Sequence, residues 1–301
     1  MGLVTTALAV DIGGTKIAAG LVSADGALYA ATRTPTPTDP DPEIVFAALA
    51  GVVADAVGAG AAAGHHPTVC GVGCGGPMTA SGATVSPLNI AGWRDFPLAS
   101  RLAGLTGLPT YVDNDAKALA LGEGWRGAAR GVRSFLAMVV STGVGGGIVL
   151  DGRLLDGDGG NAGHIGHVIA VPDGRRCACG AFGCLEAEAS GTAIAAITGR
   201  PALDAPVEVR ERTGRLVGRC VASVANLLDL RLAVVAGSVA LGFGDVFFAA
   251  AQDELDRGAC LEFSRGARIV PGGLGADGPL VGAGAVAFAG VGHRLLGDDR
   301  Q

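Results

Sequence analysis

Three cysteines and two histidines are grouped closely enough in this 301-residue sequence to bind a metal ion. The thiols belong to Cys177, Cys179 and Cys184, and His164 and His167 lie shortly upstream. Three thiolates and one imidazole complete a closed tetrahedral Zn²⁺ site, which is structural rather than catalytic. Redox or disulfide chemistry is the alternative. We disfavour it because the sequence carries no sign of secretion.

Two glycine-containing turns have the composition of phosphate-binding loops. Backbone N–H groups can approach phosphate oxygens closely where no Cβ atom intervenes. The first turn adds a hydroxyl, a cation and a carboxylate that could hold Mg²⁺; its residues are Asp11, Gly13, Gly14, Thr15 and Lys16. The second contains Thr142 and Gly143. Each turn alone is more typical of a tight hairpin, but two in corresponding positions favour a nucleotide site.

Two carboxylates stand where they could act on a substrate. Asp115 follows a short apolar run and precedes a helical pattern, so it could accept the proton of an attacking hydroxyl. A plain helix N-cap explains Asp115 equally well, and Asp113 is an equally good cap. Glu186 follows Cys184 by two residues and would be oriented by the metal loop, or it is a solvated carboxylate at a helix start.

The apolar pattern around these residues predicts alternating strands and helices. Strands are expected at Leu3–Val10, Ile17–Val22, Val69–Val72, Thr110–Val112, Phe135–Val140, Ile148–Leu150, Leu232–Val235 and Arg268–Val270. Helices are expected at Glu43–Val57, Phe96–Leu105, Ala116–Trp125, Val246–Arg257 and Leu280–Leu296, and a loop at Thr34–Pro42.

A weak internal repeat links these elements. In both halves a strand, a polar glycine turn, a second strand, an Asp-Gly turn and a third strand follow in the same order. This indicates two similar α/β halves with a cleft between their glycine turns. We expect a small N-terminal domain over 1–112, joined by a C-terminal helix at 286–301, and a larger domain over 113–285 with the metal loop.

Composition excludes several classes of protein. The sequence has 22 basic and 28 acidic residues, a net charge of −6, and therefore no basic footprint for nucleic acid. It contains no unbroken apolar run of ~20 residues, the length of a membrane-spanning helix. With 49% hydrophobic residues it is not disordered. We expect a cytoplasmic protein that binds neither nucleic acid nor membrane.

Together the motifs resemble those of the ROK family (repressors, open reading frames and sugar kinases) in the actin–hexokinase–Hsp70 superfamily. The resemblance covers nearly the whole chain, and its most specific part is the cysteine signature after Gly-His. The matching segments are Asp11–Lys16, Asn114–Ala116, Thr142–Gly147, Gly163–His167 and Cys177–Glu186. The resemblance implies an α/β, two-domain actin-like ATPase fold of the ribonuclease H type with a central cleft.

The resemblance also implies a role for each candidate residue. Asp115 is then the base that activates the sugar 6-hydroxyl, and His167 is both a zinc ligand and a sugar contact. Other sugar contacts are expected from Gly76, Asn89, Asn114 and Glu186. The two glycine turns would bind the ATP phosphates, and Gly237 and Ser238 would border the adenosine. The family implies ATP, Mg²⁺ and a structural Zn²⁺, and a homodimer or homotetramer.

Two positions depart from the family pattern. His164 replaces the usual Glu of Gly-Glu-x-Gly-His, which commonly binds the sugar 2-hydroxyl, and Gly75-Gly76-Pro77 replaces Pro-Gly-Pro. We therefore expect an ATP-dependent 6-kinase for glucose or a modified hexose, with an amino sugar such as 3-amino-3-deoxyglucose (kanosamine) as alternative. A sugar-responsive regulator or sensor is a rival from another class. We disfavour it because Asp115 and both turns are present and only ten residues precede Asp11.

Overall fold

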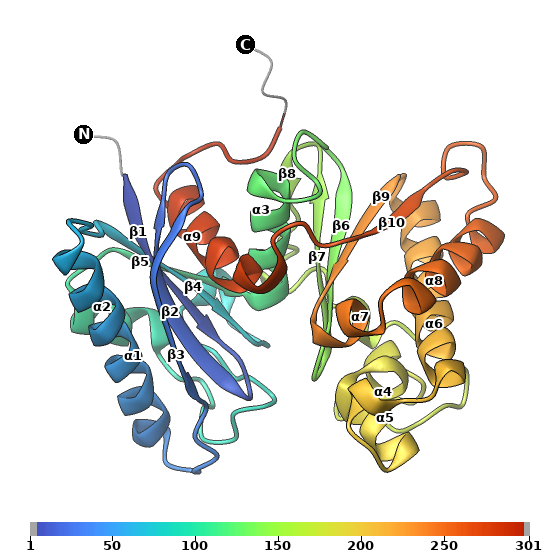
Figure 1. Cartoon of the computed structure of the whole chain (residues 1–301), viewed down its shortest axis with the longest axis horizontal. Coiled ribbons are helices and arrows are strands. Elements are labelled where there is room, and N and C mark those ends of the chain that lie inside the picture. The colour runs from blue at the N-terminus through green and yellow to red at the C-terminus, as the bar shows by residue number, and fades with distance from the viewer. Residues whose placement is uncertain (1–4, 298–301) are drawn as a thin grey trace. The chain divides into compact units, whose positions relative to one another are not determined.

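The computed structural model describes residues 5–297, and its contacts divide the chain into two units (Figure 1). Unit 1 comprises Met1–Gly131, Leu154–Ala162 and Leu274–Gln301, and unit 2 comprises Val132–Arg153 and Gly163–Gly273. The ends of both terminal predictions, at Leu3–Val4 and at 298–301, lie outside the described residues.

Unit 1 is built on a five-stranded mixed sheet with the order β3-β2-β1-β4-β5. Strand β1 pairs antiparallel with β2 and parallel with β4, which in turn pairs parallel with β5. The strands are β1 (Thr6–Ile12), β2 (Lys16–Ser23), β3 (Leu28–Pro35), β4 (Val69–Cys74) and β5 (Thr110–Asn114). β1 and β4 are buried along their whole length, as expected for strands covered on both faces.

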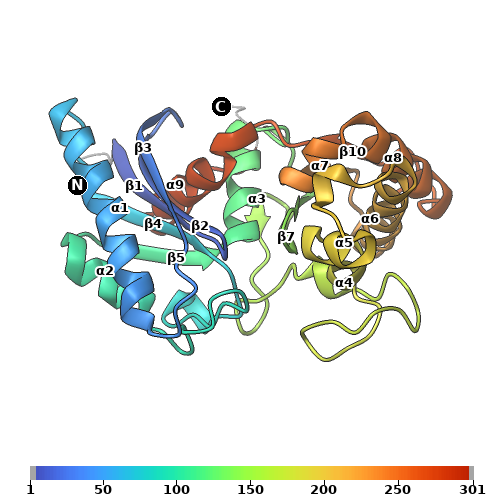
Figure 2. The ribbon, with the colours of Figure 1, turned by 60° about the horizontal axis from the view of Figure 1, so that its bottom comes forward.

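Helices cover the two faces of this sheet (Figure 2). One core contains the buried side chains of α1 (Pro42–Ala62) and α2 (Leu98–Thr106), and the other those of α3 (Asp115–Arg126) and α9 (Gly278–Gly290). By length and hydropathy α1 is a candidate membrane span, the one found among the described residues. Its Val45, Leu49 and Val52 lie in the core, however, so α1 is a core helix of unit 1.

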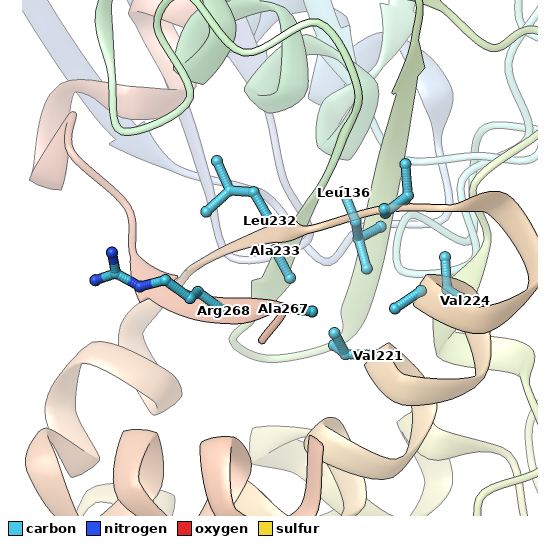
Figure 3. A pocket seen from close by; sticks show the side chains of 9 residues that line it. Leu136, Val221, Val224, Leu232, Ala233, Ala267 and Arg268 are labelled. Atoms are coloured by element: carbon cyan, nitrogen blue, oxygen red, sulfur yellow. The ribbon is translucent and has the colours of Figure 1, made fainter. Parts of the chain in front are cut away.

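Unit 2 contains a second five-stranded mixed sheet, with the order β10-β9-β6-β7-β8. Its strands are β6 (Phe135–Val140), β7 (Val144–Leu150), β8 (Arg153–Leu154), β9 (Leu232–Ala236) and β10 (Arg268–Pro271). Its helices are α4 (Leu185–Ala189), α5 (Gly191–Thr198), α6 (Val207–Leu228), α7 (Ser238–Phe243) and α8 (Asp245–Gly258). A small apolar pocket lies between α6 and the strands β6 and β9, and it is lined by side chains such as Leu136, Val221 and Leu232 (Figure 3).

The two sheets confirm the expected α/β class, and several elements differ from expectation. Strand β3 extends into the start of the expected loop, and β7 begins at Val144 rather than Ile148, so it includes part of the expected second turn. Helices α5, α6 and α7 were not predicted. Helix α9 ends at Gly290 because Gly292 takes a φ of 90°, outside the right-handed helical region. Helix α3 belongs to unit 1 although the second domain was expected to begin at 113. It packs on α9 through Trp125 and Phe288, with ring centroids 5.5 Å apart.

Candidate active site and metal centre

Asp11 and Asp115 lie on either side of Gly73 in unit 1. Asp11 stands in β1 and Asp115 follows β5, and β4 with Gly73 lies between these strands. A Cβ placed on Gly73 would be 3.5 Å from the Cα of Asp115 and 3.9 Å from Oδ1 of Asp11. Burial raises the pKa of Asp11 to about 7; the charge of Asp115 adds to this, and Lys16 opposes it. The two acids therefore form one electrostatically coupled pair.

The start of α3 separates the roles of three neighbouring polar residues. Asn114 is the N-cap, and its Oδ1 accepts a hydrogen bond from the Ala116 N–H at 3.0 Å. Asp113 forms an ion pair with Lys117, with Oδ1 and Nζ 3.0 Å apart. Asp115 is the first helical residue and also accepts from the Ala116 N–H, at 2.8 Å. The capping position thus belongs to Asn114, and Asp113 neutralises a buried lysine.

The first glycine turn is a closed hairpin between β1 and β2. The Gly13 N–H donates to the Lys16 carbonyl at 3.0 Å, and the Thr36 hydroxyl donates to the Gly13 carbonyl at 2.6 Å. Asn89 lies directly on this turn, because a Cβ on Gly14 would come within 2.5 Å of the Asn89 Cβ. The structure thus brings a predicted sugar contact against a predicted phosphate turn.

Gly76 is linked to the same region by its backbone. Its carbonyl accepts a hydrogen bond from the Leu88 N–H at 3.3 Å, one residue before Asn89. The loop from Gly76 to Asn89 is thereby closed within unit 1. The predicted sugar contacts Gly76 and Asn89 therefore belong to one connected loop.

The second glycine turn, in unit 2, is in contact with Glu186. The Val144 N–H donates to Glu186 Oε2 at 2.9 Å, and a Cβ on Gly143 would be 2.8 Å from that oxygen. Glu186 was expected to contact a sugar. In the structure it accepts a hydrogen bond from the second glycine turn, which is a contact the sequence did not predict.

Residues Gly237 and Ser238 adjoin the second turn as well. The hydroxyl oxygens of Ser238 and Ser141 are 2.9 Å apart, and the Thr142 carbonyl accepts from the Thr192 hydroxyl at 3.0 Å. Thus the predicted adenosine border and the predicted phosphate turn of unit 2 are neighbours. Ser141, Thr192 and, in unit 1, Thr36 are turn-bracing residues that sequence analysis did not single out.

The metal cluster consists of His167, Cys177, Cys179 and Cys184, whose ligand atoms all lie within 4.8 Å of one another. The distances are 3.7 Å from His167 Nδ1 to Cys177 Sγ and 3.7 Å from Cys179 Sγ to Cys184 Sγ. Ligand atoms around a tetrahedral zinc ion with metal–sulfur bonds of about 2.3 Å are separated by about 3.8 Å. The donor set and its spacing therefore fit Zn²⁺.

The electrostatics of the cluster also favour a cation. Burial raises the pKa of the Cys184 thiol to about 12, so without a nearby positive charge it is a neutral thiol. A divalent cation favours the thiolate instead. His164 does not belong to the cluster; its ring centroid is 5.9 Å from that of His167.

Comparison with known proteins identifies the class to which this fold and these sites belong. The model of the ROK family matches residues 7–289. The chain is 39% identical over 254 residues to an N-acetylmannosamine kinase of Escherichia fergusonii, covering 79% of this chain and 85% of that protein. Its fold matches the ROK family glucokinase from Streptomyces griseus, solved with glucose and AMPPNP, with a TM-score of 0.83, 32% identity and 94% and 99% coverage.

A second solved structure agrees. The ROK hexokinase from Thermus thermophilus matches with a TM-score of 0.81 and 34% identity, over 96% of this chain and all of that one. The expected actin-like ATPase fold is thus confirmed. The chain belongs to the ROK family, and within it to the ATP-dependent sugar kinases. Its His/Cys cluster fits the zinc-binding motif of that family.

Proposed function

We propose that this enzyme transfers the γ-phosphoryl group of ATP to the 6-hydroxyl of a hexose, with Asp115 as the general base. The observation that supports this most is the start of α3. There Asn114 caps the helix and Lys117 pairs with Asp113, while Asp115 lies beside Asp11 and the first glycine turn. Unit 1 contains Asp115, and unit 2 contains Glu186 and the metal cluster.

In the proposed step, the Asp115 carboxylate takes the proton of the sugar 6-hydroxyl while the 6-oxygen of the sugar bonds to the γ-phosphorus. The bond from that phosphorus to the bridging oxygen breaks, and ADP leaves with the bond's electrons. Backbone N–H groups of the two glycine turns would hold the phosphates, and Lys16 would add a positive charge. Mg²⁺, when bound with ATP, neutralises phosphate charge, and the Asp11 carboxylate is a suitable hard oxygen ligand for it.

Among hexoses we favour an N-acetylated one, N-acetylmannosamine, as the acceptor. The N-acetylmannosamine kinase relatives support this choice, and so does the chemistry of His164. A carboxylate at this position can only accept hydrogen bonds from a sugar, whereas a neutral imidazole can also donate one to an acetamido carbonyl. Glucose and an amino sugar such as kanosamine are the competing acceptors.

The test is an ADP-release assay of the full chain with ATP and Mg²⁺ against glucose, mannose, N-acetylglucosamine, N-acetylmannosamine and 3-amino-3-deoxyglucose. Phosphorus NMR of the product locates the new ester. We expect the highest kcat/KM with N-acetylmannosamine and phosphate on the 6-oxygen. A higher kcat/KM with glucose would refute the substrate assignment, and ADP release with none of these sugars would refute the proposed function.

A further inference from the structure

Lys117 is a buried cation that contacts three oxygen atoms in unit 1. Its side chain is 3% exposed, and Nζ lies 3.0 Å from Asp113 Oδ1 and 2.6 Å from Asp156 Oδ1. Nζ also donates to the Gly160 carbonyl at 3.2 Å. Burial alone would lower the pKa of Lys117, but the two carboxylates raise it, so the ammonium form is kept. The three N–H donors of an ammonium group match three converging oxygens.

The choice of lysine at this position is informative because the sequence contains 22 basic residues, of which Lys16 and Lys117 are the only lysines. Arginine has a planar guanidinium group that suits bidentate contacts, whereas a compact ammonium suits a three-oxygen pocket. A chain that otherwise uses arginine therefore has a lysine where that geometry requires one.

Residues Asp156–Asn161, which we call the strap, are anchored at a second point by Asn161. The Met78 N–H donates to Asn161 Oδ1 at 3.3 Å, and Asn161 Nδ2 donates to the Met78 carbonyl at 3.0 Å. The strap is also closed on itself, because the Ala162 N–H donates to the Asp156 carbonyl at 2.9 Å. The strap thus binds α3 through the contacts of Asp156 and Gly160 with Lys117, and it binds the chain just after Gly76-Pro77 through Asn161.

The strap therefore connects two parts of unit 1 that the proposed function assigns to the sugar. These are the Asp113–Asp115 segment and the loop that begins at Gly76. We infer that the strap positions the sugar-binding residues, with Lys117 and Asn161 as positioning residues that set sugar affinity without touching the sugar. This inference rests on the proposed function for the identity of the ligand.

The cleanest variants remove the strap contacts at exposed or peripheral atoms. The Asp156 side chain is 68% exposed, so Asp156→Ala removes the ion pair between the strap and Lys117 without opening the core. Asn161→Ala removes the second anchor. Asp158→Ala is the matched control, since Asp158 is an exposed aspartate of the same strap. In Lys117→Met the partly buried Asp113 loses its cation, so the double variant Asp113→Asn/Lys117→Met is measured beside it.

The experiment measures KM for the accepted sugar, KM for ATP, and kcat. Asp156→Ala and Asn161→Ala are expected to raise the sugar KM by about tenfold, the loss expected from one or two hydrogen bonds, with kcat and the ATP KM within about twofold. Lys117→Arg should have a higher sugar KM than the wild type, whereas Asp158→Ala should have the sugar KM of the wild type. An unchanged sugar KM in Asp156→Ala and Asn161→Ala, or the same increase in Asp158→Ala, would overturn the inference.

Failure of the proposed function gives a different result. In that case the wild-type chain phosphorylates none of the sugars, and the strap is judged by amide hydrogen exchange of the full chain. Asn161→Ala must then speed exchange over residues 76–79, whereas Asp158→Ala must not. Equal exchange in the two variants would overturn the positioning role independently of any substrate.

Discussion

Asp11 is a buried carboxyl group whose charge state depends on pH near neutrality. Burial and the neighbouring Asp115 raise its pKa to about 7, against an ordinary value of 3.8. Between these two values the folded chain binds more protons than the unfolded chain. The free energy of unfolding therefore decreases as pH rises from about 4 to 7 and is level above that range. A carboxyl group that is costly to ionise yet lies beside the first glycine turn is typical of a functional site.

The substitution Asp11→Asn removes the free-energy cost of ionising a buried carboxyl group. At pH 8 the variant is expected to unfold at a higher temperature than the wild type, because the wild type carries a buried charge worth on the order of a few kcal/mol. The difference should shrink as pH falls toward 5. Activity should decrease because the asparagine is a poorer ligand for Mg²⁺. Thermal unfolding at pH 5, 6.5 and 8 tests this, and equal unfolding temperatures for the two proteins at every pH would contradict it.

His164 is the position where the sugar preference is expected to change. A carboxylate accepts two or more hydrogen bonds from sugar hydroxyls, whereas a neutral imidazole offers one acceptor and one donor. His164→Glu is therefore expected to lower the KM for glucose by about tenfold or more, from 1–3 kcal/mol for each hydroxyl that gains a partner. The same change should raise the KM for N-acetylmannosamine and for kanosamine. If no sugar's KM moves, His164 does not contact the sugar.

At the scale of elements, the metal loop is held by α4 and α6. Glu188, 3% exposed, accepts a hydrogen bond from the Arg175 N–H at 2.7 Å and forms an ion pair with Arg212 of α6. Burial alone would raise the pKa of Glu188, but these two partners lower it below its ordinary value. Arg175 lies two residues before Cys177. The carboxylate therefore fixes the loop close to its first thiol ligand.

Arg212→Met is expected to weaken the binding of Zn²⁺ without unfolding unit 2. The wild type should contain about one Zn²⁺ per chain, as four ligands from one cluster require. The variant should release it to a chelator about tenfold faster, in the range that supporting contacts of metal ligands contribute. Arg215→Met is the control, because Arg215 forms an exposed ion pair with Glu211 on the same helix. Equal release rates in both variants, or a wild type purified without zinc, would contradict this account.

The elements differ in how well the sequence could predict them. Apolar strands such as β6 were predicted to the residue because every side chain is hydrophobic. Helix α6 was missed because its first half is rich in charge, although its buried Thr213, Val217 and Val221 repeat at helical spacing. The repeat predicted a strand after the Asp25-Gly26 turn, and β3 confirms it, but its last two residues were assigned to a loop. Alternate threonines and a proline resemble a loop, whereas at the sheet edge only one face is covered.

The sequence did not predict contacts between site residues that lie far apart in the chain. The cysteine spacing allowed the three thiol ligands to be predicted, because they lie within one short loop, and the family resemblance selected His167 as the fourth ligand. The contact of Glu186 with Val144 joins residues 42 positions apart, and that of Asn161 with Met78 joins residues 83 apart. Such pairs depend on how whole elements pack. No local pattern around Asn161 or Thr36 indicates a partner.

At the scale of the whole molecule, the two units repeat one design with different additions. Each places a glycine turn between two antiparallel strands, Ile12–Lys16 in unit 1 and Val140–Val144 in unit 2. Unit 1 adds the Asp11–Asp115 pair and the strap, and unit 2 adds the metal loop and Glu186. Assembly into a homodimer or homotetramer stays a prediction, which sedimentation of the purified chain would test.

The central claim is that this kinase uses Asp115 as its base, and one comparison tests it most directly. Asp115→Asn and Asp113→Asn are measured side by side for kcat and for binding of sugar and ATP. Asp115→Asn should lower kcat by roughly 10²–10⁴, the contribution of a positioned base, and leave both affinities within a few-fold of the wild type. Asp113→Asn should keep kcat within about tenfold, because Asp113 pairs with Lys117. Near-normal kcat in Asp115→Asn, or a larger loss in Asp113→Asn, would contradict the account.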